Sequence, residues 1–272
     1  MERKSSEIPS FHTLSVGVNL KKLLLRIFDS HFHIINPKFP LVENNGYLPP
    51  NFTVENYRKE VKDFEIVGGA IVSGSFQKFD QEYLLDSLKT FGKNYFGVAN
   101  IPIGMKKSEL EKLNESNIRA VRFNLKRGGS ESLGNMVELS NKLYDCYGWH
   151  TELYVDSKDL KELKIILEKI PKFSIDHLGL SQSGLIDLYY WADKGVKIKA
   201  TGFGRVDFNP ITVMKKIYSI NPESLMFGTD LPSTRAKEPF RYEHLKRLKD
   251  NFSEHEQKKI LYQNANDWYG KN

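Results

Sequence analysis

Short apolar runs alternate with longer amphipathic segments along most of the chain. The runs are rich in β-branched and aromatic residues, which is typical of buried strands. On this pattern eight strands are predicted, at Ile27–Ile34, Ile66–Ser73, Tyr95–Ile101, Ile118–Leu125, Trp149–Val155, Phe173–His177, Val196–Thr201 and Leu225–Asp230.

The segments between these runs repeat apolar residues at helical spacing, for example Leu160, Leu163 and Leu167. Helices are therefore predicted from Thr53 to about Asp63, and at Asp80–Phe91, Ser108–Ser116, Leu133–Tyr147, Ser157–Ile170, Gly184–Lys194 and Ile211–Ile220. Two further helices close the chain, and Ser253 with Glu256 forms a capping box for the last one.

Regular alternation of strand and helix predicts an α/β fold, specifically a (β/α)8 TIM barrel. A doubly wound open sheet is the alternative, but the eight regular units and the lack of a glycine-rich phosphate loop argue against it. We expect residues 1–26 to form an N-terminal arm and residues 27–272 a single barrel domain that includes the C-terminal helices.

Composition and charge limit the classes of binding partner and the cellular location that we expect for this protein. The net charge of +6 comes from Lys mixed with Glu along the helices, which favours a solvated surface over nucleic-acid binding. The apolar runs are too short to span a membrane, and no secretory signal is recognisable at Met1–Asn19. The single cysteine, Cys146, excludes an internal disulfide and is expected in the core. We expect a cytoplasmic protein, and the oligomeric state, a homo-oligomer included, stays open.

Polar residues on the predicted strands need an explanation, because both faces of a strand in a parallel barrel are buried. On the fourth strand, Val121 and Phe123 are predicted to face the helices, which places Arg122 inside the barrel. The predicted interior gathers polar side chains near the C-terminal strand ends, namely His31, His33, Arg122, Tyr154, His177, Lys199 and Asp230. Catalytic groups of TIM barrels come from this end, so an active site is predicted there.

The first strand carries a His-x-His pair. Period-two alternation places Asp29, His31 and His33 on one face, where two imidazoles and a carboxylate can bind a metal ion or move protons. The alternative is a pair of hydrogen-bonded structural histidines.

Three motifs together resemble a known family: Asp29–His33 (DSHFH), Ile175–Gly179 (IDHLG) and Phe227–Pro232 (FGTDLP). The combination resembles the amidohydrolase superfamily, and more narrowly the branch that contains 2-pyrone-4,6-dicarboxylate lactonase. The resemblance covers the chain from about Ile27 to Ala265 and implies a TIM barrel of the metal-dependent-hydrolase type, with its site at the barrel mouth.

The same resemblance raises the question of a metal. Many superfamily members bind one or two divalent ions, using a fourth-strand acidic bridge or carboxylated lysine and a fifth-strand histidine. Here Arg122 and Tyr154 occupy those strands, so a binuclear centre is not expected. The lactonase-like branch is thought to work without a metal, and a guanidinium repels a dication. We expect either no cofactor or a single Zn²⁺ or Mn²⁺ ion, held by His31, His33, His177 and Asp230.

The leading hypothesis is hydrolysis of a small carboxylate-bearing lactone with Asp230 as general base. His31, His33 and His177 would donate hydrogen bonds to the developing oxyanion or hold the metal. The predicted substrate-binding residues are Arg122, Arg205, Tyr154 and Lys199.

Three of these substrate-binding residues also have a structural interpretation. Arg205 would cap a loop, Lys199 would pair with Glu152, and Tyr154 would only pack. Two other functions stay open: a Zn²⁺-dependent decarboxylase of an unsaturated or aromatic acid, and a non-catalytic barrel that binds a small acid. Whether the long loop Asn36–Asn51 is a lid is also open.

Overall fold

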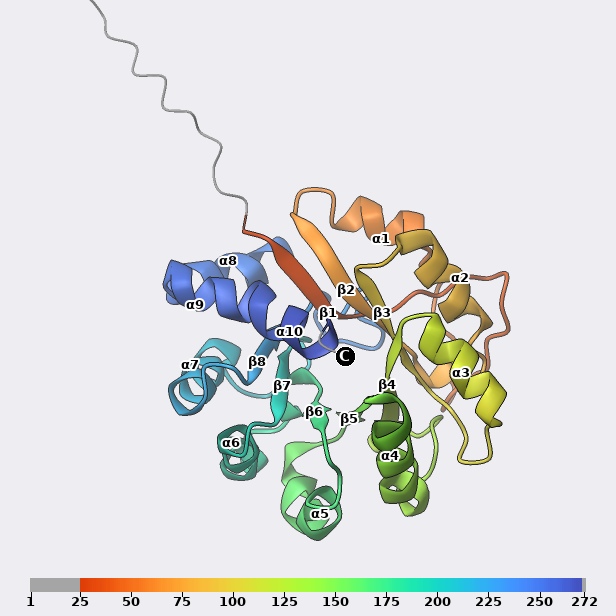
Figure 1. Ribbon diagram of the computed structural model, residues 1–272. Helices are drawn as coiled ribbons and strands as arrows, with labels where there is room; N and C mark the ends of the chain where they lie inside the picture. Colours follow the sequence, from red (N-terminus) through yellow and green to blue (C-terminus); the bar gives the residue numbers. More distant parts are fainter. Residues whose placement is uncertain (1–24, 271–272) are drawn as a thin grey trace, which may run out of the picture.

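The computed structural model describes residues 25–270, so nearly all of the expected N-terminal arm lies outside the described residues. Eight parallel strands follow one another around a barrel in chain order (Figure 1). They are β1 (Ile27–Phe32), β2 (Ile66–Val72), β3 (Tyr95–Ala99), β4 (Ile118–Asn124), β5 (His150–Tyr154), β6 (Phe173–Ile175), β7 (Lys197–Ala200) and β8 (Leu225–Phe227). The predicted TIM barrel is confirmed.

The barrel closes between β1 and the segment that follows β8. The Asp230 N–H donates to the His31 carbonyl at 2.7 Å, and the His33 N–H donates to the Leu231 carbonyl at 2.7 Å. Gly228 lies at this junction, and a Cβ there would come within 2.7 Å of the His31 nitrogen. The junction thus requires a residue without a side chain and brings two candidate catalytic residues together.

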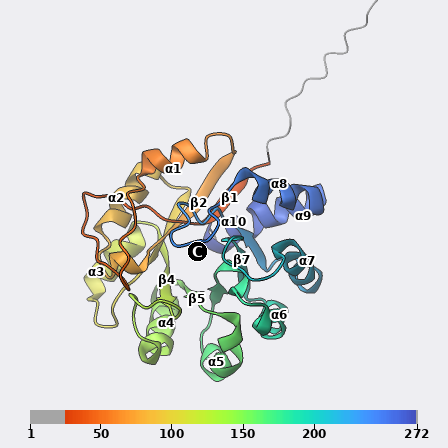
Figure 2. The same ribbon diagram turned by 180° about the vertical axis from the view of Figure 1, so that it is seen from behind.

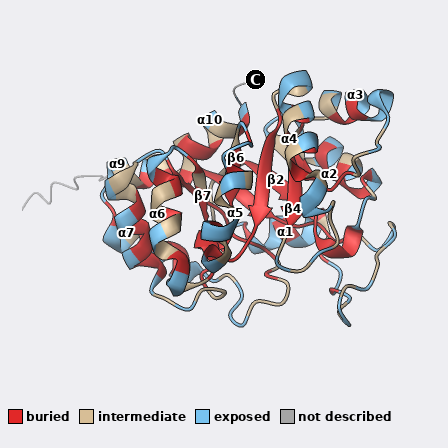
Figure 3. Ribbon diagram, turned by 90° about the horizontal axis from the view of Figure 1, so that it is seen from below, coloured by how far each residue is buried: buried red, intermediate tan, exposed pale blue. Residues whose placement is uncertain are grey.

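Helices surround the strands and bury their inner faces against them (Figure 3). They are α1 (Val54–Glu60), α2 (Glu82–Phe91), α3 (Lys107–Glu115), α4 (Leu133–Tyr147), α5 (Leu160–Leu167), α6 (Leu185–Asp193), α7 (Pro210–Ile220), α8 (Tyr242–Asn251), α9 (Glu254–Lys258) and α10 (Asn264–Gly270). Thr53 and Ser253 cap α1 and α9 as the sequence predicts. The last helix, α10, lies across one opening of the barrel (Figure 1).

The core has two layers, as expected for a barrel. Val121 and Phe123 belong to the outer layer between strands and helices, which confirms the predicted inward direction of Arg122. A smaller inner cluster fills the barrel near the N-terminal strand ends, where Tyr269 of α10 stacks on Phe28 at a ring distance of 5.5 Å. The polar groups therefore occupy the opposite, C-terminal half of the barrel.

Several local predictions are wrong. Strands β1, β3, β6 and β8 end two or three residues earlier than predicted, at Phe32, Ala99, Ile175 and Phe227. Cys146 is exposed rather than in the core. Asp29 does not share a face with His31, because the β1–β2 register shifts between Asp29 and Phe32. As a result the Asp29 side chain turns outward, where it accepts a hydrogen bond from Tyr57 of α1.

No helix between residues 25 and 270 is long and apolar enough to cross a membrane.

Candidate active site

A cavity opens at the C-terminal ends of the strands, on the side seen in Figure 2, where the loops after the strands gather. The empty space between its lining atoms, together with the open mouth, is about 380 Å³. The lining comes from seven strand ends or the loops after them: His33, Tyr47, Gly74, Ser75, Phe76, Arg122, Asn124, Arg127, Tyr154, His177, Arg205, Thr234 and Arg235.

Asp230 lies in the turn after β8 with a φ of 60°, a backbone conformation that residues other than glycine rarely adopt. The segment is held by Asp29, whose carboxylate accepts from the Thr229 N–H at 2.8 Å and the Thr229 hydroxyl at 2.7 Å. His177 has a φ of 50° in the turn after β6. Strained residues of this kind concentrate at functional sites.

The Asp230 carboxylate is completely buried, and its two oxygens differ. Oδ2 accepts a hydrogen bond from Arg205 Nε at 2.6 Å. Oδ1 has no hydrogen-bond partner within the described part of the chain and lies 4.0 Å from His31 Nε2 and 3.9 Å from His33 Nε2. Burial raises the pKa of Asp230 above its usual value, although Arg205 opposes the rise. A carboxylate with one free oxygen and a raised pKa suits general-base catalysis.

Three imidazoles surround this carboxylate from β1 and the turn after β6. The rings of His31 and His33 lie 5.1 Å apart, and those of His31 and His177 lie 4.8 Å apart. Each ring has a partner at Nδ1: the Val72 carbonyl for His33, the Thr201 hydroxyl for His177 and Lys199 for His31.

Burial lowers the pKa of all three histidines, and nearby cations lower it further. The pKa of His33 falls to about 3, with Arg122 as the next cause after burial. The pKa values of His31 and His177 fall well below the usual value, with Lys199 and Arg205 as the respective further causes. At neutral pH the rings are therefore neutral, so each carries a single ring proton.

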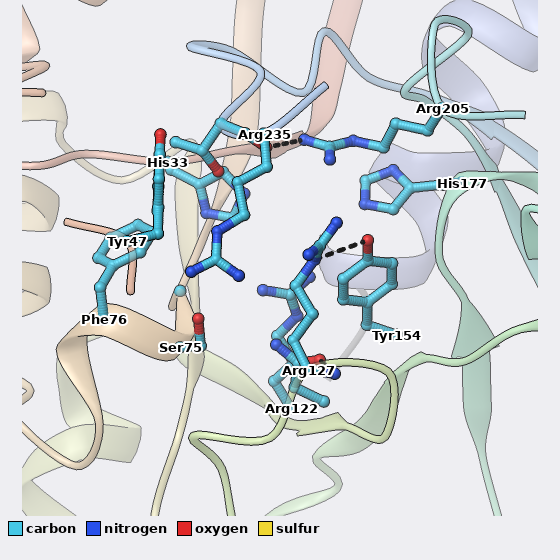
Figure 4. A pocket seen from close by; sticks show the side chains of 13 residues that line it. His33, Tyr47, Ser75, Phe76, Arg122, Arg127, Tyr154, His177, Arg205 and Arg235 are labelled. Carbon is cyan, nitrogen blue, oxygen red and sulfur yellow. Dashed lines mark hydrogen bonds between the residues drawn. The ribbon is translucent and has the colours of Figure 1, made fainter. Parts of the chain in front are cut away.

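Four guanidinium groups converge on the cavity, those of Arg122, Arg127, Arg205 and Arg235 (Figure 4). The Arg122 guanidinium is fixed by two hydrogen bonds, which it donates to the Ser73 carbonyl at 2.7 Å and to Asp176 at 2.9 Å. Its Nε has no hydrogen-bond partner among the described residues. Arg127 lies 3.4 Å from the Tyr154 hydroxyl. So many cations around one small cavity favour an anionic ligand.

The predicted site residues do not all reach the cavity. His33, His177, Arg122, Tyr154 and Arg205 line it, whereas His31 and Asp230 lie directly behind this lining and are completely buried. Lys199 lies deeper in the barrel and forms an ion pair with Glu152, the structural alternative raised above.

Several lining residues are not among the predicted site residues. The sequence places Arg127 and Arg235 on loops at the active side of the barrel, with solvated side chains as the equal alternative. They come three and eight residues after the ends of β4 and β8, and both line the cavity. Tyr47 comes from the long loop after β1, where the Arg235 guanidinium stacks at 4.4 Å on its ring. Nothing in the local sequence pattern identifies Tyr47.

The residues also fit a single metal ion. The ligand atoms of His31, His177 and Asp230 lie within 4.8 Å of one another, and a second group of this kind contains His31, Glu152 and Asp176. His31 Nε2 and Asp230 Oδ1 lack hydrogen-bond partners, as open ligand atoms would. His33 is not part of either group, so the predicted four-residue set is not brought together as a whole.

The model of the amidohydrolase family matches residues 28–271. Among characterised proteins, the chain is 24% identical over 227 residues to 4-sulfomuconolactone hydrolase of Hydrogenophaga intermedia, covering 75% of this chain and 74% of that enzyme. It is also 24% identical over 163 residues to 2-pyrone-4,6-dicarboxylate hydrolase of Comamonas testosteroni. That second match covers 58% of this chain and spans only about half, 53%, of the relative's length.

Solved structures share the fold. A protein of Acinetobacter baumannii described as a probable 2-pyrone-4,6-dicarboxylic acid hydrolase, solved with citric acid bound, superposes with a TM-score of 0.76 at 24% identity. The superposition covers 90% of this chain and 99% of that one. At this identity the likeness supports the barrel, and the chemistry must be argued from the site.

Proposed function

This chain belongs to the amidohydrolase family, and on that premise we propose that it hydrolyses a small lactone that carries carboxylate groups, with Asp230 as general base. One observation carries the proposal. Four arginines line a cavity whose floor borders a buried carboxylate with one free oxygen. The arginines account for an anionic substrate, and the carboxylate accounts for the activation of water.

The ligands of the relatives agree with this substrate class. The named relatives act on a pyrone dicarboxylate and on a sulfomuconolactone, and the Acinetobacter structure binds citric acid. All of these molecules carry anionic groups. Arg122 and Arg205 are the best placed to bind a substrate carboxylate, since both are nearly buried and a guanidinium can bind a carboxylate through two hydrogen bonds.

Ring opening would proceed by attack of water on the lactone carbonyl. Asp230 Oδ1 accepts a proton from the water as its oxygen bonds to the carbonyl carbon, and the carbonyl oxygen becomes an oxyanion. Collapse of this intermediate breaks the ring C–O bond, and the proton passes to the departing oxygen. Asp230 itself lies behind the cavity lining, and its Oδ1 is 3.9 Å from Nε2 of the cavity-lining His33. Proton transfer from the attacking water to Asp230 therefore needs one bridging water or a small rotation of the carboxylate.

The imidazoles stabilise charge in this step. His31 and His177 can donate to the oxyanion, which typically contributes about 10²–10³ in rate for each donor. If a divalent ion is bound by His31, His177 and Asp230, it would supply Lewis-acid polarisation of the carbonyl. The neighbouring guanidinium groups lower the affinity of the site for such an ion.

The proposal is tested with paired lactones that differ only in a carboxylate. We expect opening of 2-pyrone-4,6-dicarboxylate or a comparable carboxylated lactone, with kcat/KM at least 100-fold above that of the uncarboxylated ring. Activity should survive removal of metals by a chelator. Equal rates on both rings would contradict the substrate class. Release of CO₂, dependent on Zn²⁺, would identify a decarboxylase, and tight binding without turnover would identify a non-catalytic barrel.

A further inference from the structure

We infer that Lys199 is a positioning residue that holds His31 in the Nε2-protonated form, the opposite tautomer to that of His33. The inference deepens the proposed function, since it assigns different tasks to two histidines only two residues apart. It rests on the partners of the four ring nitrogens, which do not depend on the identity of the substrate.

His33 has its tautomer set by the backbone. Its Nδ1 lies 2.6 Å from the Val72 carbonyl oxygen, and a carbonyl can only accept a hydrogen bond. The ring proton of neutral His33 is therefore on Nδ1. Its Nε2, which lies 3.9 Å from Asp230 Oδ1, then carries a lone pair and can only accept.

His31 has the reverse arrangement. Its Nδ1 lies 3.4 Å from Lys199 Nζ, and an ammonium group can only donate. On the other side, its Nε2 faces the acceptor oxygen Asp230 Oδ1 at 4.0 Å. A donor at Nδ1 and an acceptor beyond Nε2 both favour a proton on Nε2.

Asp176 is the competing partner. Its Oδ1 is also 3.4 Å from His31 Nδ1, which would favour a proton there, but that oxygen forms no hydrogen bond within the described residues. It lies 3.8 Å from Lys199 Nζ, so its charge is balanced by the ammonium group. Arg122 balances the other oxygen at 2.9 Å. Among residues 25–270, removing Lys199 should leave Asp176 as the only partner at His31 Nδ1.

Lys199 is held in place by a network at the centre of the barrel. It pairs with Glu152, which also accepts hydrogen bonds from the Tyr269 hydroxyl of α10 and from His150 Nε2 at 3.1 Å. Lys199 and Glu152 are completely buried. Burial alone would raise the pKa of Glu152, but Lys199 opposes this and the pKa falls to about 2, so Glu152 is ionised at neutral pH. The C-terminal helix is thereby connected to the candidate active site.

The opposite tautomers give His31 and His33 different tasks in the proposed reaction. A water molecule that donates one hydrogen to His33 Nε2 and the other to Asp230 Oδ1 has a lone pair free for attack. The Nε2–H of His31 can then only donate, either toward Asp230 Oδ1 at 4.0 Å or to a carbonyl oxygen that enters past the cavity lining. A protonated Nε2 cannot bind a metal ion, so the contact from Lys199 also disfavours a metal at this nitrogen.

The test is nitrogen NMR of ¹⁵N-histidine-labelled full-length protein at neutral pH, without substrate. Long-range proton–nitrogen correlations distinguish the two tautomers, and single histidine substitutions assign the signals. We expect His31 with its proton on Nε2 and His33 with its proton on Nδ1. In Lys199→Met, His31 should change to the Nδ1-protonated form while His33 stays as it is.

Lys197→Met is the matched control. Lys197 is on the same strand, donates to the Glu223 carbonyl outside the network, and should leave both tautomers unchanged. A wild-type spectrum with the proton of His31 on Nδ1 would overturn the inference, as would an unchanged His31 in folded Lys199→Met. If Lys199→Met does not fold, the wild-type spectrum alone decides. None of these results depends on whether a lactone is the substrate.

Discussion

The substitution Arg205→Met tests how Arg205 sets the pKa of Asp230, the proposed general base. Arg205 Nε donates to Asp230 Oδ2 at 2.6 Å, and both side chains are nearly or fully buried. Burial raises the pKa of Asp230, and Arg205 is the strongest influence that lowers it. Removing the guanidinium should therefore raise the pKa of Asp230 further.

The size of the shift follows from the charge separation. With about 4 Å between the centres of charge and an effective dielectric constant of about 20, the attraction is about 4 kcal/mol, or roughly 3 pKa units. Water that fills the space left by Arg205 will screen part of this loss. We expect a rise of roughly 1 to 3 pKa units.

The direction of the change in the pKa of Asp230 can be measured from the pH dependence of kcat/KM, which reports ionisations of the free enzyme. A general base acts in its ionised form, so activity falls as the pH drops through the pKa of Asp230. In Arg205→Met this acid limb should move to higher pH. Arg127→Met is the control, because Arg127 lines the same cavity but contacts Tyr154 instead of Asp230. An acid limb that stays in place in Arg205→Met, or that moves equally in Arg127→Met, would refute the reasoning.

Two further predictions concern the supports of the site and are measured by urea denaturation. Gly228→Ala should lower the free energy of unfolding by about 1–3 kcal/mol, because the added Cβ would come within 2.7 Å of the His31 nitrogen at the barrel closure; an unchanged value would show that the closure can relax. Arg122→Met should lower it by about 3–5 kcal/mol, since Asp176 would lose its partner at 2.9 Å and remain buried. Wild-type stability in that variant would mean that Asp176 takes up a proton at little cost.

The fold could be predicted because its signal is repeated along the chain. Eight apolar runs, each followed by an amphipathic segment, specify a barrel even when individual boundaries are wrong. Alternation also placed Arg122 and Tyr154 correctly, because β4 and β5 are regular up to the cavity. The predictions failed where the backbone departs from regularity, as at the register shift that turns Asp29 outward.

The candidate site was predictable only in part, for a physical reason. His177 and Asp230 come after their strands end, in turns with positive φ, so strand periodicity does not apply to them. For Lys199 the sequence allows two interpretations, substrate binding or pairing with Glu152, and the side-chain contacts inside the barrel favour the pairing. Tyr47 reaches the cavity from a long loop, and its ring is placed there by stacking against the Arg235 guanidinium, a contact between distant parts of the chain.

The most direct test of the proposed chemistry is the turnover of Asp230→Asn on a carboxylated lactone that the wild-type protein opens. The amide keeps the shape of the side chain and cannot accept the proton of water, so kcat should fall by about 10²–10⁴-fold. The circular dichroism spectrum should remain that of the wild type. A folded Asp230→Asn protein that opens the lactone at close to the wild-type rate would contradict the assignment of Asp230 as the base.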